Sequence, residues 1–375
     1  TRGGGEYLFS LMATNLANKG HKVWVITNKI TDENYQLAEN IKLVFVKPNL
    51  RYSGGLPTSF LDNIQYSVNA IMTGLKIIKK EKIYIIHSNN FSPALAGSLL
   101  SLLTSKPHIT AVWDIFSLCG KNYWNEWIKQ TGISKIHGII GPLFEKMILK
   151  LPHDAIHTIS EASKDDLLKY GAKKPIHIIQ PAIENIEQKN NHIDSFQFIY
   201  IGRLVFYKNI EVIIKAINLV KKKEPRIKLV IIGGGPHKKT LEDLVHSLDL
   251  QSNIEFKGYV TAEEKVQLIS SSVALAFPSL CEGFGLGILE AFQQKKPVLV
   301  SDIRPMSDIV SHKSTGFVLD PHSEEAWAEH LLELTQDIQL AAKMGQNGYH
   351  LLEMSYSQDN MIDKILTMYK SVLRN

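Results

Sequence analysis

Short apolar runs rich in β-branched residues alternate with helical patterns along the whole chain. Runs of this kind, separated by amphipathic helices such as residues 6–19 and 63–80, are typical of parallel strands that helices cover on both faces. The first series of expected strands comprises residues 22–27, 42–47, 83–87, 108–113 and 155–160. The second series comprises residues 196–202, 228–233, 254–258, 273–277, 297–301 and 316–319. Two such series predict an α/β fold of two Rossmann-like, doubly wound domains with parallel sheets.

A polar stretch without periodicity, residues 185–194 (NIEQKNNHID), separates the two series and is typical of a linker. We therefore expect an N-terminal domain over residues 1–185 and a C-terminal domain over residues 186–357. A last helix, about residues 358–373, follows the completed second sheet and could pack on either domain. The chain opens on a glycine-rich stretch, which in α/β proteins normally follows a strand. We therefore expect a first strand ahead of Thr1 in the native protein.

The composition is that of a globular protein, with 44% hydrophobic and 21% charged residues. The formal net charge of +5 is mildly basic, which suits an anionic ligand or an anionic membrane surface. No tract of Lys and Arg is interleaved with aromatic residues, so we expect no nucleic-acid partner. No apolar run reaches the roughly 20 residues that span a bilayer, and the polar start is unlike a signal peptide. We therefore expect a cytoplasmic protein, with peripheral binding at the inner face of the membrane left open.

The segment GRLVFYK (202–208) directly follows an expected strand. Loops at the carboxyl ends of parallel strands are where α/β sheets bind ligands. Arg203 can bind phosphate oxygens through two N–H groups, and Lys208 adds a point charge. A helix that starts near Asn209 adds unpaired N–H groups. The segment, which begins at Gly202, therefore indicates a pocket that binds an anionic group. The alternative is that Arg203 and Lys208 are two solvated surface cations.

The segment PSLCEGFGLGILE (278–290) contains the second candidate constellation. Three glycines between 283 and 287 would be costly inside a helix, so we expect a loop first and a helix that starts near residues 285–287. The N–H groups at that start suit a diphosphate or a sugar hydroxyl. Glu282 and Glu290 can accept hydrogen bonds from vicinal hydroxyls. The alternative is a glycine-rich turn before a capped helix, with Glu290 stabilising the helix dipole.

Weaker motifs follow other expected strands. The stretch IIGGGP (231–236) fails the GxGxxG pattern and favours a tight turn between strand and helix. His87, taken alone, favours a partly buried histidine with satisfied hydrogen bonds, while Trp113 and Asp114 follow a strand as site residues commonly do. The chain has no P-loop, no GxSxG elbow and no DxD pair that would hold a divalent metal under a diphosphate. The charge of a diphosphate would then be balanced by Arg203, Lys208 and backbone amides.

Three segments, in this order, resemble the retaining glycosyltransferases of family 4 (glycosyl transferases group 1), which have the GT-B fold. They are GGGE (3–6), GRLVFYK (202–208), and Glu282 and Glu290 with GFG between them. Weaker similarities are HTISE (157–161), FKGYV (256–260) and STGF (314–317), so the likeness spans nearly the whole chain. The resemblance implies two Rossmann-like domains that face a cleft. The first would bind the acceptor, the second would bind the donor, and the helix over 358–375 would pack back on the first.

The resemblance also implies a role for each matching residue. Arg203 and Lys208 would bind the donor diphosphate, Glu282 the hydroxyls of the transferred sugar, and Glu290 the ribose hydroxyls. With Asp114, the first three of these residues form the catalytic group that we expect. The base would lie near Tyr259 and Val260, and the amides of Phe284, Gly285 and Leu286 would contact sugar and phosphate. The expected donor-binding residues are Gly4, Gly5, Gly202, Tyr259, Val260, Phe284, Gly285, Leu286 and Glu290, and the acceptor-side residues are His87 and Trp113.

The chain departs from the family pattern at two places. Many members have His-Asp after the fourth N-terminal strand, whereas this chain has Trp113-Asp114, which leaves Asp114 as the polar group there. Many members also have Lys-Gly in the second motif, where this chain has Lys208-Asn209. Asn still tolerates a turn conformation and can cap a helix.

We therefore expect metal-independent, cofactor-free transfer of a hexose with retention of configuration. The donor would be GDP-mannose or a UDP-sugar, and the acceptor a hydroxyl of a glycan, a lipid-linked sugar or a small molecule. Two alternatives stay open: a nucleotide-sugar epimerase of GT-B architecture, and a non-catalytic nucleotide-sugar-binding protein. Residues 122–150 mix aromatic, apolar and lysine side chains, which suits either an anionic lipid surface or ordinary packed helices.

Overall fold

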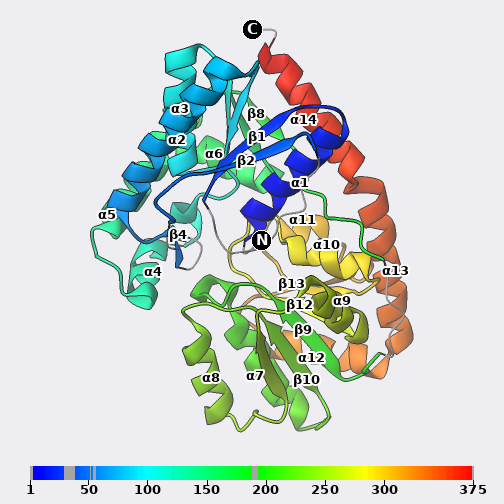
Figure 1. The fold of residues 1–375 in the computed structure, drawn as a ribbon. Helices are drawn as coiled ribbons and strands as arrows, with labels where there is room; N and C mark the ends of the chain where they lie inside the picture. The colour runs from blue at the N-terminus through cyan, green and yellow to red at the C-terminus, as the bar shows by residue number, and fades with distance from the viewer. Residues whose placement is uncertain are drawn as a thin grey trace. The chain divides into compact units, whose positions relative to one another are not determined.

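The chain divides into two compact units in the computed structural model, drawn in Figure 1. Unit 1 contains Thr1–Glu184 and Gln358–Asn375, and unit 2 contains Asn185–Ser357. The structure describes residues 3–28, 39–50, 52–53, 56–120, 122–187 and 193–373. The sequence places the boundaries at 185/186 and 357/358, and the C-terminal helix belongs to the same unit as the N-terminal half.

Unit 1 contains short parallel strands in two sheets. One sheet pairs β1 (Val23–Thr27) with β2 (Ile41–Phe45), and the other has the order β5-β6-β7-β8. Its strands are β5 (Ile86–Ser88), β6 (His108–Ala111), β7 (Ala155–Thr158) and β8 (Ile176–Ile178). A short antiparallel ribbon pairs β3 (Tyr52–Ser53) with β4 (Leu56–Pro57). The sequence prediction misses β8, because the three residues IHI are too few to stand out as an apolar run.

Helices cover both faces of the four-stranded sheet of unit 1. Helices α1 and α14 share a buried cluster with Ala155 of β7, whereas α3, α5 and α6 share one with Ile156. Because successive residues of a strand point to opposite faces, the two groups of helices cover opposite faces. The helices are α1 (Gly4–Asn18), α2 (Phe60–Lys80), α3 (Ser92–Thr104), α4 (Tyr123–Thr131), α5 (His137–Ile148), α6 (Glu161–Tyr170) and α14 (Gln358–Leu373), and a 3-10 turn, η1, covers Phe116–Leu118.

The C-terminal helix α14 is bound to α1 by polar as well as apolar contacts. The side-chain amide of Asn15 donates to Oε1 of Gln358 over 3.0 Å, and Lys19 Nζ lies 3.0 Å from Oδ1 of Asp363. Helix α1 also packs on the β1-β2 sheet, through Ala13. Within the described residues, β1 and β5 each pair along one edge.

Unit 2 is built on one six-stranded parallel sheet with the order β11-β10-β9-β12-β13-β14. Each strand falls on a run that the sequence analysis predicts. The order reverses between β9 and β12, and ligands bind at such a reversal in doubly wound sheets. The strands are β9 (Gln197–Ile201), β10 (Lys228–Ile232), β11 (Ile254–Gly258), β12 (Ala274–Phe277), β13 (Val298–Ser301) and β14 (Gly316–Leu319).

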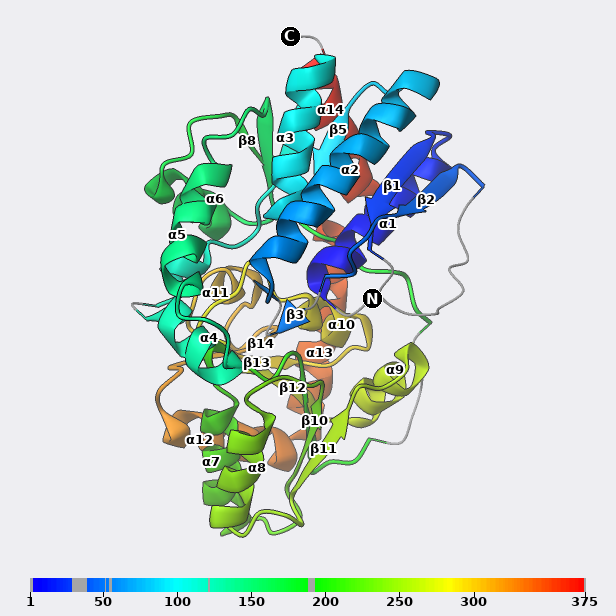
Figure 2. The ribbon, with the colours of Figure 1, turned by 60° about the vertical axis from the view of Figure 1, so that its left-hand side comes forward.

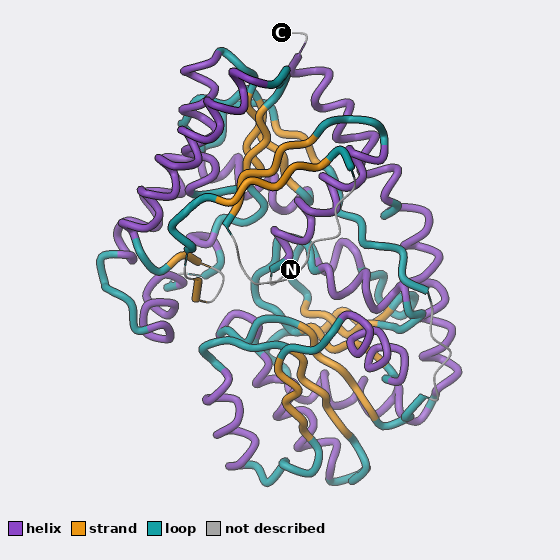
Figure 3. Tube along the Cα trace, in the orientation of Figure 1, coloured by secondary structure: helices purple, strands orange, loops and turns teal. Residues whose placement is uncertain are grey.

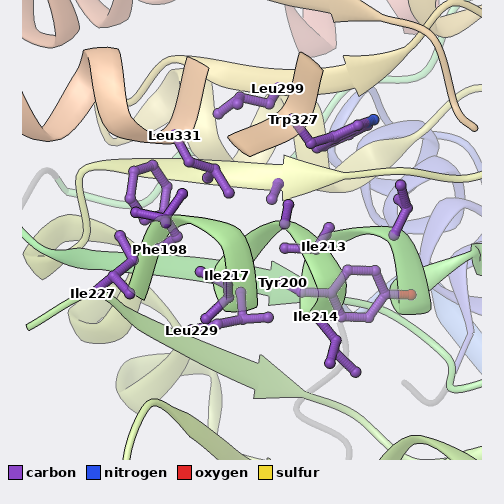
Figure 4. Packing of buried hydrophobic residues seen from close by; sticks show 14 of the residues in the cluster. Phe198, Tyr200, Ile213, Ile214, Ile217, Ile227, Leu229, Leu299, Trp327 and Leu331 are labelled. Atoms are coloured by element: carbon purple, nitrogen blue, oxygen red, sulfur yellow. The ribbon is translucent and has the colours of Figure 1, made fainter. Parts of the chain in front are cut away.

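Buried apolar side chains bind the helices of unit 2 to its sheet. Phe198 and Tyr200 of β9 pack with Ile213 and Ile217 of α7 and with Trp327 of α12 (Figure 4). Figure 3 shows the strands of unit 2 flanked by helices, as the fully apolar strands require. The helices are α7 (Ile210–Lys221), α8 (Lys238–Ser247), α9 (Ala262–Ser271), α10 (Leu286–Gln293), α11 (Met306–Ile309), α12 (Glu324–Gln336) and α13 (Ile338–Ser355), and a 3-10 turn, η2, covers Phe206–Lys208.

Candidate active site

Two loops of unit 2 lie side by side at the reversal of strand order. One follows β9 and carries Arg203 and Lys208, and the other follows β12 and carries Glu282. Because β9 and β12 are parallel neighbours, their carboxyl ends meet at one edge of the sheet. The backbone N–H of Leu280 donates to the carbonyl of Tyr207 over 2.8 Å and joins the two loops. The motifs that the sequence singles out are therefore brought together by the sheet order.

Lys208 and Glu282 form a buried ion pair between these loops. Nζ of Lys208 donates to Oε1 of Glu282, and the two side chains are only 7% and 12% exposed. The hydroxyl of Ser279 donates to the same carboxylate oxygen over 2.8 Å. The Lys208 ammonium group also lies 5.4 Å from the ring centroids of Tyr207 and Phe277. A cation and a carboxylate are thus preset in a nearly dry place, where electrostatic interactions are stronger than in water.

Tyr200, at the end of β9, lies at the centre of this group of charges. Its hydroxyl donates to the carbonyl of Arg203 over 3.0 Å. Burial raises the pKa of Tyr200 well above its usual value, the charges of Glu282 and Tyr207 raise it further, and Arg203 opposes them. One buried hydroxyl therefore lies within electrostatic reach of both Arg203 and Glu282. Sequence reasoning missed Tyr200, because a tyrosine inside an apolar strand looks like an ordinary core residue.

The glycine stretch after β10 shapes this site through its backbone. Gly233 has a φ of +124°, and a Cβ there would overlap the carbonyl of Gly202. The N–H of Leu204 donates to the carbonyl of Gly234 over 3.0 Å, and a Cβ at Gly235 would overlap the carbonyl of Leu204. The β9 loop can therefore pair with the β10 loop only if these positions are glycine. This is the tight-turn role that the sequence favours.

A helix start lies beside Glu282. Gly285 is the N-cap of α10, with a φ of +100° and no capping side chain, so the helix begins at Leu286 as the sequence predicts. Phe284 is buried, and its ring meets that of Tyr356 edge-on at 5.6 Å. The first amides of a helix have no partners inside it and can donate to an anion.

Glu290 lies just after the first turn of α10 and pairs with a lysine of α9. It is the fifth residue of the helix, and its Oε1 lies 2.6 Å from Nζ of Lys265 on α9. Both side chains are partly exposed, so the pair is open to exchange with a ligand. Sequence reasoning missed Lys265 because nothing in the sequence relates α9 to α10. It also missed Ser279, although a serine three residues before Glu282 could have been predicted to donate a hydrogen bond to that carboxylate.

Two other predicted positions in unit 2 are explained by local geometry. Asn209 takes the left-handed conformation that the sequence allows, with a φ of +51°. Its side chain does not cap α7, and it donates instead to the carbonyl of Pro321 over 2.8 Å. Tyr259 follows β11, is 75% exposed and covers Gly234, and Val260 beside it is partly exposed. Their contact with a nucleotide base stays a prediction.

The glycine stretch of unit 1 belongs to helix α1, which begins before residue 6, where the sequence predicts its start. Gly4 and Gly5 are the first residues of α1, and Gly3 is its N-cap. A Cβ at Gly5 would lie 3.1 Å from the ring of Trp113 and 3.4 Å from the side-chain amide of Asn89. The glycine is needed because the helix start passes close to these two side chains. Gly5 and Trp113, both predicted site residues, therefore lie together.

His87 lies in a cluster of aromatic rings in unit 1. Its Nδ1 is 2.8 Å from the hydroxyl of Tyr369, its Nε2 is 3.3 Å from Nδ1 of His157, and Phe9 packs between His87 and Trp113 at 5.3 and 5.5 Å. Desolvation, with a smaller contribution from the neighbouring histidines, lowers the pKa of His87 well below its usual value. The structure thus agrees with a half-buried, hydrogen-bonded histidine.

Asp114 follows Trp113 and is half-buried, and its catalytic role stays a prediction. Across the described ranges, no three His, Cys, Asp or Glu side chains gather as metal ligands would. Metal independence and the lack of a cofactor also stay predictions.

Comparison with known proteins identifies the class of protein. Two basic residues and a carboxylate follow the strands at the reversal of a doubly wound sheet, with a glycine-led helix start beside them. This arrangement suits a transferase that handles an anionic leaving group. The model of Glycosyltransferase Family 4 matches residues 2–185, and that of Glycosyl transferases group 1 matches residues 182–351. The protein is therefore a glycosyltransferase with the GT-B fold. It belongs to the glycosyl transferases of group 1.

Curated relatives and solved structures are similar over most of the chain. An uncharacterized glycosyltransferase of Methanocaldococcus jannaschii is 22% identical over 96% of this chain and 92% of its own. The O-antigen chain mannosyltransferase C of Escherichia coli is 26% identical over 68% of this chain and 69% of its own. The sucrose-phosphate synthase of Thermosynechococcus elongatus shares the fold, with a TM-score of 0.81 and 17% identity over 99% of this chain and 94% of its own. Anabaena HepE, solved with UDP-glucose, has a TM-score of 0.76 and 16% identity over 99% of this chain and 97% of its own.

Proposed function

We propose that the protein transfers a hexose, with retention and without a metal, from a nucleoside-diphosphate sugar to an acceptor hydroxyl. The observation that carries the proposal is the buried Lys208–Glu282 pair at the reversal of strand order in unit 2. The names of similar proteins support this donor class, since one is a mannosyltransferase and another was solved with UDP-glucose. The donor is accordingly GDP-mannose or a UDP-sugar.

Negative charge develops on the diphosphate as it leaves, so positive groups beside it stabilise the transition state. Lys208 is held by the carboxylate of Glu282 and lies beside two aromatic rings, and the hydroxyl of Ser279 holds that carboxylate in place. The lysine therefore need not reorganise when charge develops. Arg203 directly follows β9, as Lys208 does a few residues later, and can bind two phosphate oxygens at once. The amides of Phe284, Gly285 and Leu286 add the dipole of α10. Preset groups of this kind each contribute a few kcal/mol to a transition state.

The two carboxylates recognise hydroxyls in this proposal. Glu282 releases part of its bond to Lys208 when the diphosphate arrives, and then accepts from hydroxyls of the transferred sugar. Glu290, which lies at partial exposure beside Lys265, accepts from the ribose, and Tyr259 and Val260 lie against the base. The acceptor hydroxyl attacks on the face that the diphosphate leaves, and a departing phosphate oxygen takes its proton.

Unit 1 supplies the acceptor side in this proposal. We propose that Gly4 and Gly5, at the start of α1, contact the donor phosphate, that Asp114 is a catalytic residue, and that His87 and Trp113 contact the acceptor. The similar proteins include a capsular polysaccharide biosynthesis glycosyltransferase of Staphylococcus aureus, 22% identical over 82% of this chain and 82% of its own. A glycan or a lipid-linked sugar at the cytoplasmic side of a membrane is therefore the acceptor class that we favour.

Product analysis tests the proposal. The chain is incubated with GDP- or UDP-sugars labelled in the sugar, with and without mixed glycan and lipid-linked acceptors. We expect the native chain to transfer label to an acceptor with the anomeric configuration of the donor. Lys215→Ala is the control, because Lys215 is exposed and pairs with Glu324 away from the site, and it should transfer label like the native chain. Lys208→Ala should lose roughly 10²–10³ in turnover. Label that is isomerised without an acceptor would identify an epimerase, and binding without any product a non-catalytic protein.

A further inference from the structure

An exposed apolar stripe runs along helix α2 of unit 1. Phe60, Ile64, Val68 and Met72 stand at four-residue spacing and are 48%, 45%, 52% and 53% exposed, and Leu61 beside them is 76% exposed. Residues four apart lie on one face of a helix, and twelve residues of helix span about 18 Å. The opposite face of α2 packs on α3, where Gly74 lies against Leu100. The stripe is thus a second apolar face that the fold of unit 1 does not use.

Two neighbouring helices extend this surface. Figures 1 and 2 show α2 and α3 side by side, and the stacked rings of Phe91 and Phe144 join the start of α3 to α5. Helices α3 and α5 also expose apolar side chains. Most of the large exposed hydrophobic side chains in the described part of the chain therefore lie on α2, α3 and α5 or directly beside them. Scattered exposed apolar residues are normal, but a contiguous surface of this kind marks a docking site. The α2/α3/α5 surface is formed by Phe60, Leu61, Ile64, Val68, Met72, Leu99, Leu102, Leu103, Ile136, Ile139, Leu143 and Met147.

The charges of these helices are almost all positive. Lysines end α2 and follow α3, and others precede, interrupt and follow α5 (Lys76, Lys79, Lys80, Lys106, Lys135, Lys146 and Lys150). Counted over the same helices and flanks, the acidic residues are Asp62 in the first turn of α2, Glu81 at its C-cap, and Glu145. Glu145 is buried and accepts from the N–H groups of Phe116 and Ser117, so it does not face this surface. Basic residues therefore clearly outnumber acidic ones on these helices and their flanks.

We propose that the α2/α3/α5 surface docks on a lipid bilayer that carries anionic headgroups. Apolar side chains enter the headgroup boundary while flanking lysines contact the lipid charges, as in interfacial amphipathic helices. A second copy of the chain fits less well, because it would bring one basic surface against another. In the described ranges, no helix is both long and apolar enough to cross a membrane. The aromatic side chains of α4 (Tyr123, Trp124 and Trp127) are buried and take no part, so from residues 122–150 only α5 and its flanking residues contribute.

Vesicle co-sedimentation of the full chain tests this surface. We expect binding to vesicles of phosphatidylcholine with phosphatidylglycerol, little binding to phosphatidylcholine alone, and loss of binding at high salt. Lys79→Glu/Lys80→Glu should weaken binding by at least about 25-fold, since each lysine near an anionic surface contributes roughly a fivefold factor. Leu61→Gln/Val68→Gln, which leaves the charge unchanged, should weaken it at least roughly tenfold through lost apolar burial.

Two matched controls and one second measurement make the test decisive. Met354→Gln removes an 83% exposed apolar side chain of α13, and Lys239→Glu reverses an exposed lysine of α8, so both should bind vesicles like the native chain. All substituted positions are exposed, and circular dichroism checks that each variant is folded. Equal binding by native and surface variants, or equal binding to both vesicles, would overturn the proposal. A dimer in light scattering that only the surface variants dissociate would assign the surface to a second copy. Sugar transfer to a soluble acceptor should be unchanged in these variants, so failure of this proposal is separable from failure of the proposed function.

Discussion

The buried ion pair between Lys208 and Glu282 can be tested separately as a structural and as a functional element. Removing one partner of a buried pair costs about 3–5 kcal/mol of stability, because the remaining charge is left buried without its counterion. Glu282 keeps its hydrogen bond from Ser279, and both side chains are slightly exposed. We therefore expect Lys208→Met to lower the free energy of unfolding of unit 2 by about 3 kcal/mol, at the lower end of that range.

Removing both charges together should separate the two roles. In Lys208→Met/Glu282→Gln the new side chains have shapes similar to those they replace, and neither is charged. The free energy of unfolding should therefore return to within about 1 kcal/mol of the native value. Turnover should not return, because the cation that meets the diphosphate is still absent, and should stay roughly 10²–10³ below native. Urea unfolding without ligand and initial rates at saturating donor measure the two quantities. Near-native turnover in the double variant would refute the reasoning and leave the pair a purely structural one.

Three further predictions separate the fold of each unit from the donor site. Gly233→Ala should lower the free energy of unfolding of unit 2 by at least about 2 kcal/mol in urea unfolding, because its Cβ would overlap the carbonyl of Gly202. Gly258→Ala, whose Cβ would meet no atom, should lower it by about 1 kcal/mol through backbone strain alone. Equal losses in the two variants would contradict this reasoning. Burial lowers the pKa of His108 and of His157 to about 4, so only the unfolded chain gains protons as the pH falls from about 6.5 toward 4. Stability should therefore fall by about 2 kcal/mol per histidine between pH 7 and pH 5, and a flat profile would contradict it. Glu290→Gln should raise KM for the donor roughly tenfold with turnover nearly unchanged, and a loss confined to turnover would exclude ribose binding.

The strands of unit 2 could be predicted because each is a run of apolar residues long enough to stand out. β12 and β13 are buried along their whole length, which is what a sheet covered on both faces requires. In unit 1, β8 escaped because three residues alternate isoleucine with histidine. Helix α2 begins at Phe60 and not near residue 63, because the hydroxyl of Ser59 accepts from the N–H of Asp62 and caps it.

The site was predictable to the extent that its residues follow strands. Arg203, Lys208 and Glu282 stand at the carboxyl ends of β9 and β12, and the parallel order of these strands brings them together. Their partners were not predictable. The pairing of Lys208 with Glu282 and that of Glu290 with Lys265 depend on the packing of segments distant in sequence, which no local pattern encodes. The start of α1 was misjudged because glycine normally breaks helices, whereas Gly5 is required by the nearby ring of Trp113.

Titration of the native chain with UDP- and GDP-sugars, followed by calorimetry, tests the central claim most directly. The account predicts saturable binding of at least one donor in the presence of a chelator. It also predicts a roughly 10- to 100-fold weaker Kd for Arg203→Ala, since a charge-assisted contact to phosphate contributes about 1.5–3 kcal/mol. Lys215→Ala, which removes an exposed lysine of α7, should bind like the native chain. Binding that needs a divalent metal, or that is unchanged in Arg203→Ala, would contradict a metal-independent diphosphate site in unit 2.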